Sequence, residues 1–221
     1  MSISITSAEF ALFLGLSIVI AVLYYVGYKR NMKTIEAVSK SLENSLKPSD
    51  KEYTWLGGVL GFTGNYTIEG FEKVTASVFM LPRQSILYFP FSYITTGYDR
   101  VEVLFFLKNK VWNEVHVIRD IKPSYQMPKI FNAHLLKTEK LTINEKPFVV
   151  MYRNKTGEVD SIISLGQSLE PLGIMHIALT PEKRVLYVRL KIKPKSVSEI
   201  EDAMKTCLSY SEHMKSNNTD N

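Results

Sequence analysis

The chain has 221 residues, of which 45% are hydrophobic and 22% charged, and its formal net charge is +5. This is the composition of an ordinary globular protein, and the charge is too small to indicate nucleic acid or anionic lipid as a partner, although it is compatible with either. The only cysteine, Cys207, excludes an internal disulfide, which fits a reducing cytosol, and we interpret it as a small buried hydrophobe.

Residues Phe10 to Tyr28 form an uncharged apolar run that is followed directly by Lys29 and Arg30. Nineteen helical residues cover roughly the 30 Å hydrocarbon core of a bilayer, so the run predicts a single N-terminal transmembrane anchor over residues 1–30. A cleaved signal peptide is the alternative, but no positive charge precedes the run and no small-residue cleavage site follows it. A core helix of a soluble protein fits less well, because the run is apolar on all sides.

The residues that flank the run predict its orientation. Met1 to Glu9 contains no Lys or Arg, whereas basic residues crowd the other end: Lys29, Arg30 and Lys33. By the positive-inside rule, the C-terminal part of the chain is cytosolic, at the plasma membrane in a prokaryote or the ER membrane in a eukaryote. Thr6 and Glu9 have the spacing of a capping box at the start of the helix.

Residues 31–52 predict a short juxtamembrane helix and linker. Apolar residues recur there at helical spacing, and Pro48 ends the pattern after Ile35, Val38, Leu42 and Leu46. We expect a stalk that packs on the domain or lies on the headgroups, and a solvated linker helix is the alternative.

Residues 53–210 predict one cytosolic α+β domain. Runs rich in Val, Phe and Thr predict strands over residues 66–68, 74–80, 101–107, 115–119 and 148–152. We expect the third and fourth of these to form a hairpin through Lys108 to Lys110. Residues 124–141 are ambiguous, with a helical turn or two suggested near His134.

The last third of the chain has the clearest pattern. Thr156 precedes a helix that Pro171 and Gly173 stop, and residues 174–179 read as a buried strand. Residues 184–193 alternate, with Leu186, Val188, Leu190 and Ile192 on one face, and Ser196 with Glu199 caps a helix carrying Val197, Ile200, Met204 and Leu208. The order predicts a mainly antiparallel sheet with helices packed on one face. Residues 211–221 predict a disordered tail.

The sequence contains no motif that indicates catalysis, a cofactor or a metal site. The four histidines, His116, His134, His176 and His213, are scattered, and none has Cys, Asp or Glu at ligand spacing. The glycines at positions 57, 58, 61 and 64 lack the strand–loop–helix setting of a phosphate-binding loop. We therefore expect a non-enzymatic protein. A membrane-tethered enzyme, with titratable residues gathered from distant positions into a cleft, remains an alternative.

Two surfaces are candidates for binding. A basic strip on the polar face of the alternating strand consists of Arg184, Tyr187, Arg189, Lys191, Lys193 and Lys195. Such a strip would suit rRNA or lipid headgroups, and a plain solvated strand face is the alternative; we expect no DNA partner. In the anchor, small residues lie four apart (Ala11 with Gly15, Ser17 with Ala21), which allows close approach of a partner helix but also arises by chance.

The order of elements resembles the calumin family, the ribosome- and translocon-associated subunits of the PAT intramembrane chaperone complex. Four segments carry the resemblance: Leu81 to Gln84, Asp99 to Val103, Leu172 to His176, and the strand, proline turn and helix from Val185 to Cys207. Calumin-like proteins also have a signal peptide, an acidic lumenal region and a long basic coiled-coil tail. This chain begins almost at the span and ends at Asn221, so we expect a short relative, archaeal in type.

The resemblance implies a non-enzymatic scaffold or chaperone subunit. It would assist insertion and assembly of multipass membrane proteins near the Sec translocon and the ribosome, together with a small membrane-protein partner. Ribosome contact would then fall to the domain surface, where the strip around Arg189 is the candidate. The alternative function is a single-span sensor or ligand-binding domain, which a deep apolar pocket with a few convergent polar groups would favour.

Overall fold

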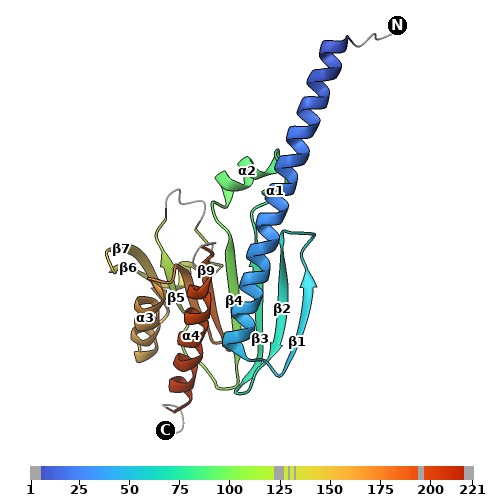
Figure 1. The fold of residues 1–221 in the computed structure, drawn as a ribbon. Coiled ribbons are helices and arrows are strands. Elements are labelled where there is room, and N and C mark those ends of the chain that lie inside the picture. Colours follow the sequence, from blue (N-terminus) through green and yellow to red (C-terminus); the bar gives the residue numbers. More distant parts are fainter. Residues whose placement is uncertain (1–5, 122–126, 129, 132, 194–196, 217–221) are drawn as a thin grey trace.

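The structure, a computed structural model, describes residues 6–121, 127–128, 130–131, 133–193 and 197–216. Figure 1 shows one long helix that projects from a domain built on a single sheet. The architecture is α+β, as the sequence predicts.

Helix α1 (Ser7–Leu46) joins the predicted anchor and the predicted juxtamembrane segment in one continuous helix of 40 residues. The predicted capping box is present, with Thr6 and Glu9 exchanging hydrogen bonds. Among the described helices, α1 alone is long and apolar enough to cross a membrane, and only 6% of its most apolar window is buried. The second half of α1 belongs to the core, because Ile35, Val38 and Leu42 are almost fully buried. The juxtamembrane helix is therefore packed on the domain and is not a solvated linker.

The described residues form a nine-stranded antiparallel sheet in the order β1-β2-β3-β4-β9-β8-β5-β7-β6. The strands are β1 (Asp50–Trp55), β2 (Gly61–Thr67), β3 (Phe71–Phe79), β4 (Arg100–Leu107), β5 (Val115–Arg119), β6 (Lys137–Ile143), β7 (Lys146–Tyr152), β8 (Ile174–Thr180) and β9 (Val185–Lys191). The predicted hairpin through Lys108 to Lys110 is wrong. Strand β4 pairs with β3 and β9, whereas β5 pairs with β7 and β8, so the chain crosses the sheet between them.

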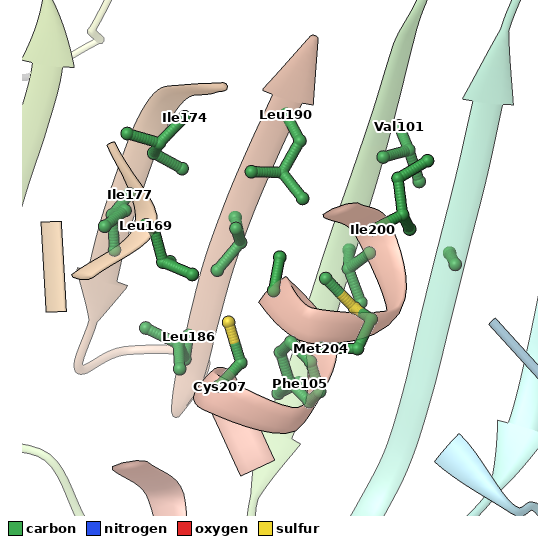
Figure 2. Close-up of a cluster of buried hydrophobic side chains, with 14 of the residues drawn as sticks. Val101, Phe105, Leu169, Ile174, Ile177, Leu186, Leu190, Ile200, Met204 and Cys207 are labelled. Carbon is green, nitrogen blue, oxygen red and sulfur yellow. The ribbon is translucent and has the colours of Figure 1, made fainter. Parts of the chain in front are cut away.

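Helices α1, α3 (Gly157–Leu169) and α4 (Ser198–Ser216) lie on one face of the sheet (Figure 1). Figure 2 shows the centre of this packing, where Met204 and Cys207 of α4 lie over Phe105 of β4 and Leu186 of β9. All four side chains are fully buried, which confirms the predicted packing face of the last helix and the burial of Cys207. Burial without a polar partner raises the pKa of the Cys207 thiol to about 12.

Two segments differ from the sequence prediction. Helix α4 continues to Ser216 and so enters the predicted disordered tail, because Ser211 is buried and its hydroxyl donates to the carbonyl of Leu208. Residues 217–221 lie outside the described residues, as does the predicted cap Ser196. A short helix, α2 (Tyr88–Thr95), which the sequence analysis did not expect, lies in the connection between β3 and β4, and a 3-10 turn occupies Ala133–Leu135.

Candidate membrane-facing groove

Asn31 fixes α1 to the sheet at the end from which the apolar half of the helix projects. Its side chain is fully buried, and its amide nitrogen donates to the carbonyls of Val59 (3.1 Å) and Leu81 (2.8 Å). Its amide oxygen accepts a 3.0 Å hydrogen bond from the Arg83 guanidinium. One polar residue of α1 therefore holds both the β1–β2 turn and the start of the β3–β4 connection.

The two ends of the β3–β4 connection are held together by a buried ion pair. Arg83 donates to both carboxylate oxygens of Asp99, at 2.8 and 2.7 Å, and the Leu81 backbone amide donates to the same carboxylate at 2.8 Å. Asp99 is only 3% exposed. Because this pair is bidentate and the carboxylate has a third donor, it closes the base of the connection that carries α2.

The connection touches α1 at Gly27. A Cβ built on Gly27 would lie 2.3 Å from the carbonyl oxygen of Arg83 and 2.6 Å from the amide nitrogen of Gln84. No side chain fits there, so the two backbones are in direct contact. Gly27 is the penultimate residue of the apolar run, which ends at Tyr28. The connection therefore meets the helix at the level where the predicted span ends.

A groove with a volume of about 640 Å³ lies between the β1–β2 turn, the end of β3 and the connection. It is lined by Leu56, Leu60, Phe79, Met80, Leu81, Pro82, Gln84, Ser85, Tyr88, Ser92, Thr96, Tyr98 and Arg100. The volume is that of a typical small-ligand site, and the lining is largely apolar.

Two polar groups of the groove wall stand out. The side-chain oxygen of Gln84 is buried and has no hydrogen-bond partner among the described residues. The Arg100 guanidinium lies 4.4 Å from the centre of the Phe79 ring and pairs with Glu102 at 2.7 Å. The groove can thus enclose an apolar group, and its wall contains one buried acceptor without a partner among the described residues.

The basic strip is largely neutralised within the domain. Arg184 pairs with Glu72 (2.7 Å), Arg189 with Glu102 (3.2 Å) and Lys193 with Glu199 (2.8 Å). Tyr187 and Arg189 are half-buried and joined by a 2.8 Å hydrogen bond. Lys195 lies outside the described residues. Lys191 is exposed near the Tyr98 ring, and no acid among the described residues lies within ion-pair distance of it.

Two histidines that are far apart in the sequence meet on neighbouring strands. Nδ1 of His116 in β5 lies 3.2 Å from Nε2 of His176 in β8, and the His176 ring packs edge-on against Tyr187 in β9. Burial lowers the pKa of His176 well below its ordinary value, and the nearby His116 and Arg189 lower it further. Burial also lowers the pKa of His116, opposed in part by Glu114. Both rings are therefore neutral at physiological pH.

The other sequence candidates are placed apart from the groove. The small residues Ala11, Gly15, Ser17 and Ala21 are exposed on the projecting half of α1, and a Cβ at Gly15 would meet nothing within 4 Å. Among the described residues, no group of three or more His, Cys, Asp or Glu side chains could hold a metal ion.

The groove itself was not expected from the sequence. One signal for it was available: residues 85–98, SILYFPFSYITTGY, contain no charged side chain and five aromatic rings. At fourteen residues this run is too short for a span, and its length fits either a buried core helix or an interfacial segment.

Comparison with known proteins gives no family. No protein-family model matches the chain, and no curated protein matches it. The resemblance to the calumin family therefore stays a prediction.

Proposed function

We propose that this protein is a non-enzymatic, single-pass membrane scaffold whose cytosolic domain holds a segment of a partner membrane protein in the groove. One observation carries the proposal: an apolar groove opens at the end of the domain where the apolar run of α1 ends. A membrane-protein segment at the bilayer surface would reach the groove without crossing water, so apolar side chains could transfer into it at low cost.

The chemistry of the groove wall favours a polypeptide that carries polar groups. The unpartnered oxygen of Gln84 is buried in the wall, and after a rotation of this side chain into the groove it would accept from a backbone amide, an Asn or a Ser of the bound segment, whereas an acyl chain offers no donor. Polar groups are the part of a membrane span that is least stable in lipid. The groove would therefore shield such segments before their own partners assemble around them.

The same proposal includes the cellular location that the resemblance to the calumin family implies. It would put the domain beside the Sec translocon, with a small membrane-protein partner packed on one of the two small-residue pairs of α1, Ala11 with Gly15 or Ser17 with Ala21. Ribosome contact is supported by the resemblance and, on the domain surface, by the exposed cation Lys191. The positive-inside rule supports the cytosolic orientation.

A second candidate function is a sensor that binds a single-chain amphiphile. It is favoured by the volume of about 640 Å³, which suits a small ligand, and by Arg100 in the wall, which would attract an anionic headgroup.

A photo-crosslinking amino acid at Leu60, in the groove, distinguishes the two functions in the full chain in its own membrane. Scaffold function predicts light-dependent adducts with the transmembrane segments of other membrane proteins. Adducts with lipid alone would favour the sensor. The same amino acid at Ser164, exposed on α3, is the matched control, and equal adducts at both positions would contradict a role for the groove.

Purification in mild detergent separately tests whether the protein lies beside the translocon and the ribosome. Translocon subunits and ribosomal proteins should co-purify with the full chain, and their absence would remove the calumin-like part of the proposal.

A further inference from the structure

Helix α2 presents large apolar side chains to its surroundings. The large apolar side chains exposed on α2 and on the two residues before it are Ile86 (39%), Leu87 (87%), Tyr88 (68%), Phe91 (65%), Tyr93 (58%) and Ile94 (63%). The helix has no buried residue. Soluble surfaces rarely gather so many large apolar side chains in nine residues, so this face requires an apolar surrounding.

The position of α2 indicates that the apolar surrounding is the membrane. The Gly27 contact and the Asn31 hydrogen bonds attach the start of the connection to α1 where its apolar run ends. Helix α2 begins five residues after Arg83, and Figure 1 shows it beyond the ends of β3 and β4, on the side from which α1 projects. A bilayer crossed by residues 10–28 would have its headgroup layer at this height.

The residue types match the headgroup layer. Helix α2 carries exposed tyrosines at positions 88 and 93, and α1 carries exposed tyrosines near the end of its apolar run, at positions 24, 25 and 28. Two exposed cations, Lys29 and Arg30, follow directly on α1. Tyrosines gather at membrane–water interfaces because one end of the ring is apolar and the other polar, and cations there meet anionic headgroups.

We propose that α2 is a second membrane contact, an interfacial helix whose exposed side chains at Tyr88 and Phe91, together with that of Leu87 at its N-cap, lie in the bilayer. The occupant of this face is the lipid surface itself, and not a second copy of the chain or another protein. With α1 crossing the membrane and α2 lying in its surface, the domain is held at two points, which fixes its tilt and keeps the groove turned toward the membrane. This inference does not depend on what the groove binds.

Spin-label accessibility tests the inference on the full chain, purified and reconstituted in vesicles of phosphatidylcholine and phosphatidylglycerol. Single cysteines replace Leu87 at the N-cap of α2 and Phe91 within it, Leu23 on α1 as the lipid reference, and Glu182 at the far end of the sheet as the water reference. The native Cys207 is fully buried and its thiol pKa is raised to about 12, so it competes little for the label.

Labels at positions 87 and 91 should match position 23, with a ratio of oxygen to water-soluble nickel-complex accessibility several-fold above that at position 182. Nickel accessibility equal to that of position 182 would overturn the inference. So would spectral broadening that disappears when labelled protein is diluted with unlabelled protein, because a second copy would then cover the face. All four positions are exposed, and two independent sites, one at the N-cap of α2 and one within it, guard against a local folding defect at either.

Discussion

The side-chain amide of Asn31 donates a 2.8 Å hydrogen bond to the carbonyl of Leu81, 50 residues further along the chain. This bond joins α1 to the β3–β4 connection about one turn after the last residue of the apolar run. Because α1 is continuous from the predicted span into the core, the orientation of the domain follows from that of the helix.

Replacing Asn31 with Leu should destabilise the domain by about 2–4 kcal/mol, because the carbonyls of Val59 and Leu81 and one donor of Arg83 lose their buried partner. Urea unfolding of a fragment that begins at Lys29 measures the change. Lys40→Leu, at an exposed position of α1, is the matched control. Equal midpoints for the Asn31 variant and the parent would show that this contact does not hold the helix.

Met204→Asp should lower the free energy of unfolding of the same fragment by about 3–5 kcal/mol, because Met204 is fully buried against the sheet (Figure 2) and the new carboxylate would have no partner there. Ser209→Asp on the exposed side of α4 should change the free energy of unfolding little. If both variants and the parent have the same free energy of unfolding, α4 is not part of the core.

The pair His116 and His176 should make stability fall in mild acid. Both have lowered pKa values in the folded state, whereas in the unfolded chain they titrate near 6.5. Below about pH 6.5 the unfolded state binds more protons than the folded state. The free energy of unfolding therefore decreases as the pH is lowered, by up to about 1.4 kcal/mol per pH unit for each proton. Above that pH the contribution is fully present.

Urea unfolding at neutral and mildly acidic pH measures this slope. The double variant His116→Gln/His176→Gln keeps polar groups at both positions and should show a smaller fall in acid than the parent. Identical slopes would mean that other groups carry the acid sensitivity.

The orientation can be read from the acceptor motifs at Asn65, Asn154 and Asn217, each followed two residues later by Thr. A cytosolic domain does not meet the glycosyltransferase, so expression in a glycosylating host membrane should leave all three unmodified. A glycan on any of them, detected as a mass shift that a glycosidase removes, would reverse the predicted orientation.

The sequence predicted the elements whose signal is local. Strands β4, β5, β7, β8 and β9 and helix α3 were expected close to their observed bounds, because their apolar residues alternate or recur at helical spacing. Strand β1 was missed because five of its six residues are exposed at the edge of the sheet, so it carries no alternation.

Features that depend on distant pairing could not be read in the same way. The β4–β5 hairpin was wrong because strand neighbours are set by long-range packing, and the contact of His116 with His176 joins residues 60 apart. The groove combines the turn at Leu56 with Thr96, so no local pattern describes it. The charge-free segment around α2 was the one available signal, and it indicates a membrane contact only because the fold places it beside the end of the predicted span.

The most direct test of the scaffold is capture of a defined span peptide in nanodiscs that hold the full chain. The peptide is a polyleucine helix with photo-reactive leucines and one central Asn, and its adducts are mapped by mass spectrometry. The account predicts adducts at Leu56 and Leu60, fewer for a peptide without Asn, and a several-fold loss when Ser92→Phe fills the groove. Ser164→Phe, outside the groove, should leave the yield unchanged. Adducts that are spread evenly over the domain, or that survive Ser92→Phe, would contradict it.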